Sequence, residues 1–121
     1  MHTNNTTEDF NMAKSERIAQ LNDALRQTMT GGKVILTNGV ASSSEEVIAA
    51  VTQKVRSYDA FDPEDGDDPY GEHDFGALDH EGTKYFWKID YYDNAMEYLS
   101  EDPEDPAKTN RVLTILLASE Y

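Results

Sequence analysis

The spacing of apolar residues near the start of the chain predicts a helix. Four of them recur at intervals of three and four residues, which places them on one helical face: Ile18, Leu21, Leu25 and Met29. The helix is expected to run from Lys14 to about Met29, because the glycine pair that follows is a common helix end. Residues 1–12 are polar and rich in Asn and Thr, so we expect a flexible tail there.

A second apolar stripe predicts another helix, which is expected to end near Tyr58. Its members are Val47, Val51 and Val55, with Ile48. A run of three serines precedes this stripe, and two pairs of residues there fit a capping box: Ser42 with Glu45, or Ser43 with Glu46. Either pair would begin the helix.

A period-two alternation later in the chain predicts a β-hairpin. Its arms are residues 74–78 and 84–92, joined by a turn over residues 79–83. In the second arm one alternating set is expected to face the core: Tyr85, Trp87, Ile89 and Tyr91. A short helix or turn is expected over residues 93–99.

Two further segments are predicted to be strands. Residues 33–37 form a short one that ends at the turn pair Asn38-Gly39. Residues 111–118 are apolar at nearly every position, which indicates an interior strand with both faces covered.

The predicted order of elements is α-β-α-β-β-(α)-β. Strands joined as a hairpin and helices set apart from them favour the α+β class. We therefore expect a two-layer domain over residues 13–121, in which two main helices pack on one face of a four-stranded, mainly antiparallel sheet.

Charge is distributed very unevenly along this chain. The formal net charge is −14, and residues 59–105 contain seventeen acids against only Lys84 and Lys88. The rest of the chain is close to neutral. The strongly negative electrostatic potential of such a segment favours binding to basic partners or cations, and it opposes binding to nucleic acid or to anionic membranes.

Composition excludes several further classes. The chain has no cysteine, which removes disulfides, thiolate metal sites and a cysteine nucleophile. No apolar run approaches the roughly 18 residues that a membrane span needs. The first twelve residues lack the basic and apolar regions of a signal peptide, so a cytoplasmic location is expected.

Most of the excess acid falls in two segments that proline and glycine keep irregular, residues 59–73 and 100–107. We expect both to be exposed loops that contact a basic partner. The candidate partner-binding residues are Asp62, Glu64, Asp65, Asp67, Asp68, Tyr70, Glu72, Glu101, Asp102, Glu104 and Asp105.

No catalytic or cofactor motif stands out. An EF-hand calcium loop fails in both possible registers, because neither Gly66 nor Gly71 at loop position 6 places a carboxylate at position 1. A P-loop, a nucleophile elbow and the acid-x-lysine motif of restriction-type nucleases are also absent. One cluster is left as a candidate for metal binding or hydrolysis: Glu72, His73, Asp74 and His80. We assign no cofactor, metal or catalytic residue.

Several runs resemble an uncharacterised bacterial family, domain of unknown function 3768. The most specific are YGEHDFG and FWKIDYYD, and the resemblance extends over roughly residues 14–121, including ERIAQLNDALRQTMTGG, VILTNGV and RVLTILLASEY. Members of the family are found mainly in proteobacteria, often on mobile elements. The resemblance implies a small soluble domain and supplies no activity and no functional residues.

Three functional hypotheses follow. The acids can imitate the phosphates of a nucleic acid and occupy the basic groove of a nucleic-acid-binding defence complex, as anti-restriction and anti-CRISPR proteins of mobile elements do. Alternatively, the acidic loops only keep a housekeeping or regulatory domain soluble. A metal-dependent enzyme is the third hypothesis, with the Glu72–Asp74 and His80 cluster as its only candidate site.

Overall fold

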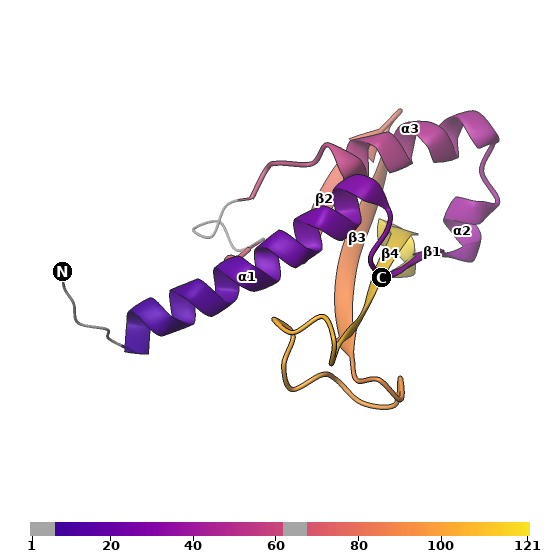
Figure 1. The fold of residues 1–121 in the computed structure, drawn as a ribbon. Coiled ribbons are helices and arrows are strands. Elements are labelled where there is room, and N and C mark those ends of the chain that lie inside the picture. Colours follow the sequence, from indigo (N-terminus) through magenta and orange to yellow (C-terminus); the bar gives the residue numbers. More distant parts are fainter. Residues whose placement is uncertain (1–6, 62–67) are drawn as a thin grey trace.

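The computed structural model describes residues 7–61 and 68–121, and for residues 7–13 the backbone only. Its helices and strands follow one another along the chain (Figure 1). The elements are α1 (Thr7–Thr28), β1 (Lys33–Leu36), α2 (Asn38–Ala41), α3 (Glu45–Arg56), β2 (Phe75–His80), β3 (Thr83–Tyr92), β4 (Asn110–Leu117) and the 3₁₀ turn η1 (Ala118–Glu120).

The four strands form one mixed sheet in the order β1-β4-β3-β2. β2 pairs with β3 and β3 with β4 in antiparallel fashion, whereas β1 runs parallel to β4. The α+β class and the interior position of β4 are therefore confirmed. The sheet was predicted to be mainly antiparallel, and it is mixed, with two antiparallel pairs and one parallel pair. The parallel pair could not be foreseen, because sequence patterning does not specify which strand β1 joins.

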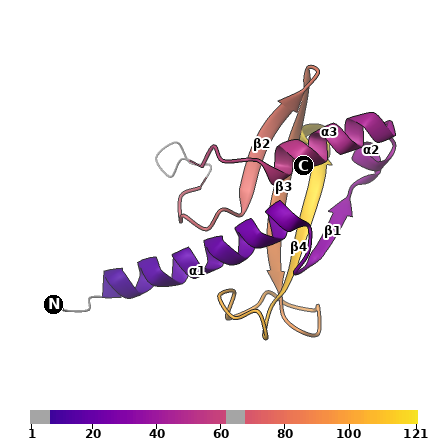
Figure 2. The ribbon, with the colours of Figure 1, turned by 45° about the horizontal axis from the view of Figure 1, so that its top comes forward.

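Helices and sheet contribute to a single core. Leu25 of α1 and Val51 of α3 lie in one buried cluster with Trp87 of β3 and Ile115 of β4. The predicted core face of β3 is confirmed at Tyr85, Trp87 and Ile89, which are all buried, and Tyr91 is half-buried. Figure 2 shows α1 and α3 beside the sheet that carries these residues.

Trp87 requires a glycine on the neighbouring strand. Gly76 of β2 lies opposite Trp87, and a Cβ at position 76 would come within 2.4 Å of the indole Nε1. The side chain of Tyr58 would also be only 2.7 Å from that Cβ. The glycine therefore allows the indole to approach the backbone of β2 closely.

The first helix is longer than predicted. α1 begins at Thr7, so residues 7–12, which we expected to belong to a flexible tail, are helical. These residues include no glycine or proline, and adding turns to an existing helix costs little. Residues 1–6 lie outside the described part of the chain.

The start of α3 corrects both predicted capping boxes. The N-cap is Ser44, whose Oγ accepts the backbone N–H of Val47 at 3.2 Å. Ser42 instead ends α2, since its hydroxyl donates to the Asn38 carbonyl at 2.6 Å. The pair Asn38-Gly39, predicted to be a turn, begins this short helix.

The hairpin turn is tighter than predicted. β2 and β3 pair up to His80 and Thr83, which leaves only Glu81 and Gly82 in the turn. Both have positive φ, at 51° and 82°, the backbone of a type I′ turn, which suits the twist of a hairpin. Glu81 is an unusual residue for that position, so the sequence signal for the turn was weak.

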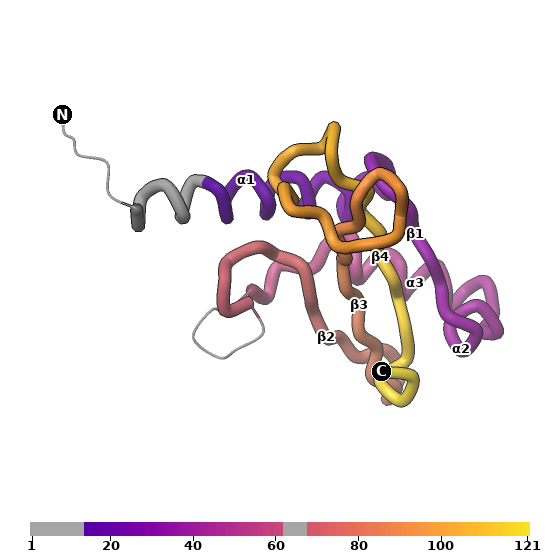
Figure 3. The backbone as a smooth tube through the Cα atoms, turned by 90° about the horizontal axis from the view of Figure 1, so that it is seen from below, coloured from indigo at the N-terminus to yellow at the C-terminus, as the bar shows by residue number. Residues whose placement is uncertain are grey.

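The chain between β3 and β4 has no helix over residues 93–99 and consists of turns. A single bridge joins Tyr92 to Leu99. Viewed from below, the later part of this segment, near Glu104, lies beside α1 (Figure 3). Over the described residues, none of the helices has the length and apolar character to cross a bilayer.

Candidate functional site

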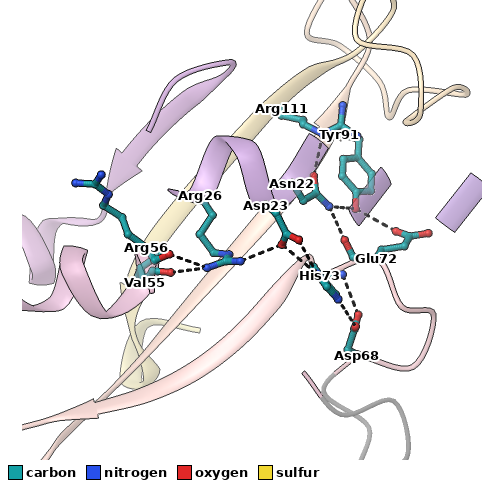
Figure 4. A network of polar contacts seen from close by, with 10 residues as sticks. All are labelled: Asn22, Asp23, Arg26, Val55, Arg56, Asp68, Glu72, His73, Tyr91 and Arg111. Atoms are coloured by element: carbon teal, nitrogen blue, oxygen red, sulfur yellow. Dashed lines mark hydrogen bonds and ion pairs between the residues drawn. The ribbon is translucent and has the colours of Figure 1, made fainter. Parts of the chain in front are cut away.

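A buried polar stripe on α1 organises the candidate site. Asn22 and Arg26 lie one helical turn apart and are both fully buried, although the same face of α1 also carries Leu25. Buried polar groups require partners, because an unpaired one costs about 1–3 kcal/mol. Figure 4 shows that the partners come from α3, from the loop before β2, and from β3 and β4.

Arg26 joins α1 to the end of α3. Its Nη1 donates to the carbonyls of Val55 at 3.0 Å and Arg56 at 3.1 Å, and its Nη2 contacts Asp23 Oδ1 at 2.9 Å. The last carbonyls of a helix lack partners within the helix and form its negative end, so a cation is favourable there. The guanidinium carbon also lies 5.3 Å from the ring of Phe61. Arg26 is therefore a structural group.

His73 attaches the loop before β2 to α1. Its Nδ1 lies 3.0 Å from Asp23 Oδ1, and its ring stacks on Phe61 with a centroid distance of 3.8 Å. The backbone N–H of His73 donates to Asp68 Oδ1 at 3.0 Å. Asp68 is only 2% exposed, so its carboxylate serves to shape this loop.

A second set of bonds surrounds Asn22. Its Nδ2 donates to the Glu72 carbonyl at 2.9 Å and to the Tyr91 hydroxyl at 2.8 Å, while its Oδ1 accepts from Arg111 Nε at 2.8 Å. The Tyr91 hydroxyl donates onward to Glu72 Oε1 at 3.0 Å. Burial is the main cause that raises the pKa of Tyr91, so the phenol keeps its proton.

Arg111 connects this network to the second acidic loop. Its Nη2 donates to the carbonyl of Pro103. Burial lowers the pKa of Arg111, whereas Tyr91, Glu72 and Glu104 act in the opposite direction. Glu72 comes from the first loop and Glu104 from the second, so one buried cation lies between the described parts of both loops.

The described parts of both acidic loops therefore lie at the same end of the sheet. β2 begins, β3 ends and β4 begins at that end, since Phe75 pairs with Lys88 and Tyr92 with Asn110. Lys14 of α1 adds a further contact, 3.9 Å from Glu104 Oε1. We call residues 68–74 and 93–109 the acidic end.

The predicted partner-binding residues fall into four groups. Tyr70 and Glu101 are exposed, while Glu72, Asp102, Glu104 and Asp105 are half-buried. Asp68 is buried and is not available to a partner in this structure. The remaining four lie outside the described residues: Asp62, Glu64, Asp65 and Asp67.

The candidate metal or hydrolase cluster is not assembled. His80 lies at the far end of β2, where it pairs with Thr83 and contacts Glu81 at 3.5 Å. Glu72, His73 and Asp74 lie before the opposite end of that strand. Within residues 14–61 and 68–121, no three His, Asp or Glu side chains are placed to hold a metal ion.

Sequence reasoning missed the central residues of the network, which are Asn22, Asp23, Arg26, Tyr91 and Arg111. One available signal was the pair Asn22 and Arg26 beside Leu25, because two large polar residues one turn apart interrupt an apolar helix face. Another was Arg111 near the start of β4, a strand in which apolar residues predominate on both faces.

Comparison with known proteins gives one match. The sequence model of the family described as "Protein of unknown function (DUF3768)" matches residues 36–120, well over half of the chain. That match covers α2, α3 and the strands β2, β3 and β4. It leaves out α1 and all but the last residue of β1, although the resemblance noted from the sequence began near residue 14. No curated protein and no solved structure matches. The chain belongs to the DUF3768 family.

Proposed function

We propose that the chain acts by binding a basic protein surface through its acidic end, in competition with nucleic acid. A nucleic-acid-binding defence complex is the partner class that this charge fits, as for anti-restriction and anti-CRISPR inhibitors. The two loops act together in this proposal. They stand at one end of a two-layer domain in which α1 and α3 cover one face of the sheet.

The observation that carries the proposal is the meeting of both loops around Asn22 and Arg111. Glu72 is bonded to Tyr91, and the Pro103 carbonyl accepts from Arg111, so each loop is attached to the same buried network. Fixed carboxylates lose less side-chain entropy when a partner binds than mobile ones do. A basic groove would thus meet a surface of defined shape.

Exposed apolar side chains at the acidic end favour binding to a protein partner over the alternative that this surface only keeps the chain in solution. Tyr98 is 73% exposed, and Leu99 and Met96 are exposed beside it. Glu97 lies between Met96 and Tyr98 in the chain, Glu101 follows soon after Leu99, and both are exposed as well. A purely solubilising surface accounts for the acids but not for the apolar residues among them, whereas interfaces commonly combine an aromatic anchor with a charged rim.

The test compares two equal reductions of charge at different places. The variant Glu97→Gln/Glu101→Gln changes the acidic end, and Asp79→Asn/Glu81→Gln changes exposed acids at the far end of the β2–β3 hairpin. Proteins captured by the immobilised chain at low salt are identified and purified, and their affinities are measured by calorimetry with and without a DNA duplex.

We expect the acidic-end variant to bind such a partner at least tenfold more weakly, and the hairpin variant to bind like the native chain. Binding should weaken steeply with salt, and duplex DNA should displace the chain, because both present negative charge to the same groove. Equal losses in the two variants would mean that only total charge matters. That result, or a partner that holds DNA and this chain together, contradicts the proposal.

A further inference from the structure

A hollow of about 350 Å³ opens beside the first acidic loop, at the start of β2. It lies on the face of β3 that carries the side chains of Lys88 and Asp90. The buried side chains of Trp87 and Ile89 point to the other face, because side chains alternate along a strand. Six of its lining residues matter here, and they are Tyr70, Asp74, Phe75, Lys88, Asp90 and Tyr121. None of them takes part in the polar network around Asn22.

Aromatic rings form the walls of this hollow. Tyr70 is 79% exposed and Tyr121 is 75% exposed, so both rings are open to a ligand. Tyr121 is nevertheless held in place, with its ring centroid 5.3 Å from that of Phe86 and 6.0 Å from that of Phe75. Exposed aromatic rings around one hollow attract cations, because the face of each ring carries negative electrostatic potential.

Carboxylates complete the hollow, and one of them lacks a counter-charge. Asp90 is paired with Lys88, whose Nζ lies 2.7 Å from Asp90 Oδ2. The carboxylate of Asp74 has no cationic side chain in contact within the described part of the chain. It is half-buried, and its pKa is raised by burial and then by repulsion from neighbouring acids, chiefly Glu72. A cation bound in the hollow would relieve this repulsion.

We propose that the hollow binds the guanidinium group of an arginine side chain that the basic partner inserts between Tyr70, Tyr121 and Asp74. A guanidinium is planar and can stack on one ring while it donates two hydrogen bonds to a carboxylate, which a lysine ammonium cannot do. The inference rests on the proposed function for the source of the arginine. The affinity of the hollow for a guanidinium group does not depend on the proposed function.

The first test uses the native chain and Nα-acetyl-arginine amide, followed by ¹H–¹⁵N correlation spectra. We expect saturable shifts centred on the amides of Asp74 and Phe75, with millimolar affinity. The norleucine analogue has a similar length without charge and should produce none of these shifts. Absence of saturable shifts, or shifts spread equally over the exposed acids of the whole chain, would refute the arginine site.

Three variants assign the contributions. Asp74→Asn and Tyr70→Ser should each weaken arginine binding by about fivefold, as expected for loss of one charged or cation–π contact. Asp74→Asn removes a repelled charge, so its loss of binding should not come with loss of folding. Tyr98→Ser is the matched control, because Tyr98 is equally exposed but lies outside the hollow. An equal loss in the Tyr98→Ser variant would overturn the assignment.

The same variants distinguish this inference from the proposed function. If arginine amide fails to bind while the native chain still captures a basic partner through Glu97 and Glu101, the hollow is not the anchor and the proposed function stands. If arginine amide binds at the hollow and no basic partner competes with DNA, the arginine site stands and the proposed function fails.

Discussion

Arg26→Met is the substitution with the largest predicted effect on stability. It removes the cation that contacts Asp23 and bonds the carbonyls of Val55 and Arg56. Methionine preserves much of the apolar volume of the side chain, so the cavity left behind is small. The loss of stability is therefore dominated by carbonyls at the end of α3 that lose their donor and by the Asp23 carboxylate, which loses its arginine partner.

The size of this effect follows from the burial of the guanidinium. Removing one partner of a buried charged pair costs about 3–5 kcal/mol, whereas exposed pairs contribute about 0–1 kcal/mol. Arg26 is fully buried and Asp23 is half-buried, so we expect a loss near the lower value, about 3 kcal/mol. Against a total stability of roughly 5–15 kcal/mol, that loss is a substantial fraction.

Urea unfolding measures this loss directly. Trp87 is the single tryptophan, is buried, and has its ring 5.3 Å from the Arg26 guanidinium carbon, so its fluorescence reports on this part of the core. Arg17→Met is the control, because Arg17 lies exposed on the same helix and should change stability by less than about 0.5 kcal/mol. A loss below about 1 kcal/mol for Arg26→Met would show that water or rearrangement satisfies the α3 carbonyls, and the reasoning would fail.

Two further predictions concern pH. The pKa of Asp74 is raised in the folded chain by burial and by nearby acids, so the ionised carboxylate opposes folding above that raised pKa. This penalty disappears below the unfolded value of 3.8. Asp74→Asn should therefore raise the thermal midpoint at pH 7 but not at pH 3, and no rise at pH 7 would refute this prediction. The pKa of Glu120 is lowered by hydrogen bonds, first from the Thr37 hydroxyl at 2.5 Å and then from the backbone N–H groups of Leu117 and Gly39. Its contribution to stability is therefore present above the unfolded value of 4.5 and is lost as pH falls through the lowered pKa. Glu120→Gln should speed amide exchange at Gly39 near pH 7, and unchanged exchange there would show that the carboxylate does not hold α2.

Features that depend on local pattern were predicted correctly. The apolar stripes of α1 and α3 and the alternation of β3 each involve residues close in sequence, so one element suffices to define them. β4 was recognised as an interior strand because both of its faces are apolar. The exact ends were less accurate, since the choice of Ser44 over its two neighbours depends on where α2 stops.

The candidate site could not be predicted because its partners are far apart in the chain. Asn22 reaches Arg111, and Arg26 reaches the carbonyl of Val55, across long stretches of sequence. The sequence located both acidic loops by their charge, yet only the antiparallel pairing of β3 with its two neighbours places them at one end of the sheet. A pairing of that kind leaves no periodic signal in either loop.

The parallel pairing of β1 with β4 has a consequence for the order of folding. Val34 pairs with Leu113, so the long stretch of chain between these two residues must be organised before this edge of the sheet can close. The hairpin of β2 and β3 closes a much shorter loop, and short loops close sooner because less chain entropy is lost. We therefore expect the hairpin to nucleate the sheet, β4 to add to it, and β1 to join last, so that an intermediate without β1 exposes one edge of β4 while the acidic end is already formed.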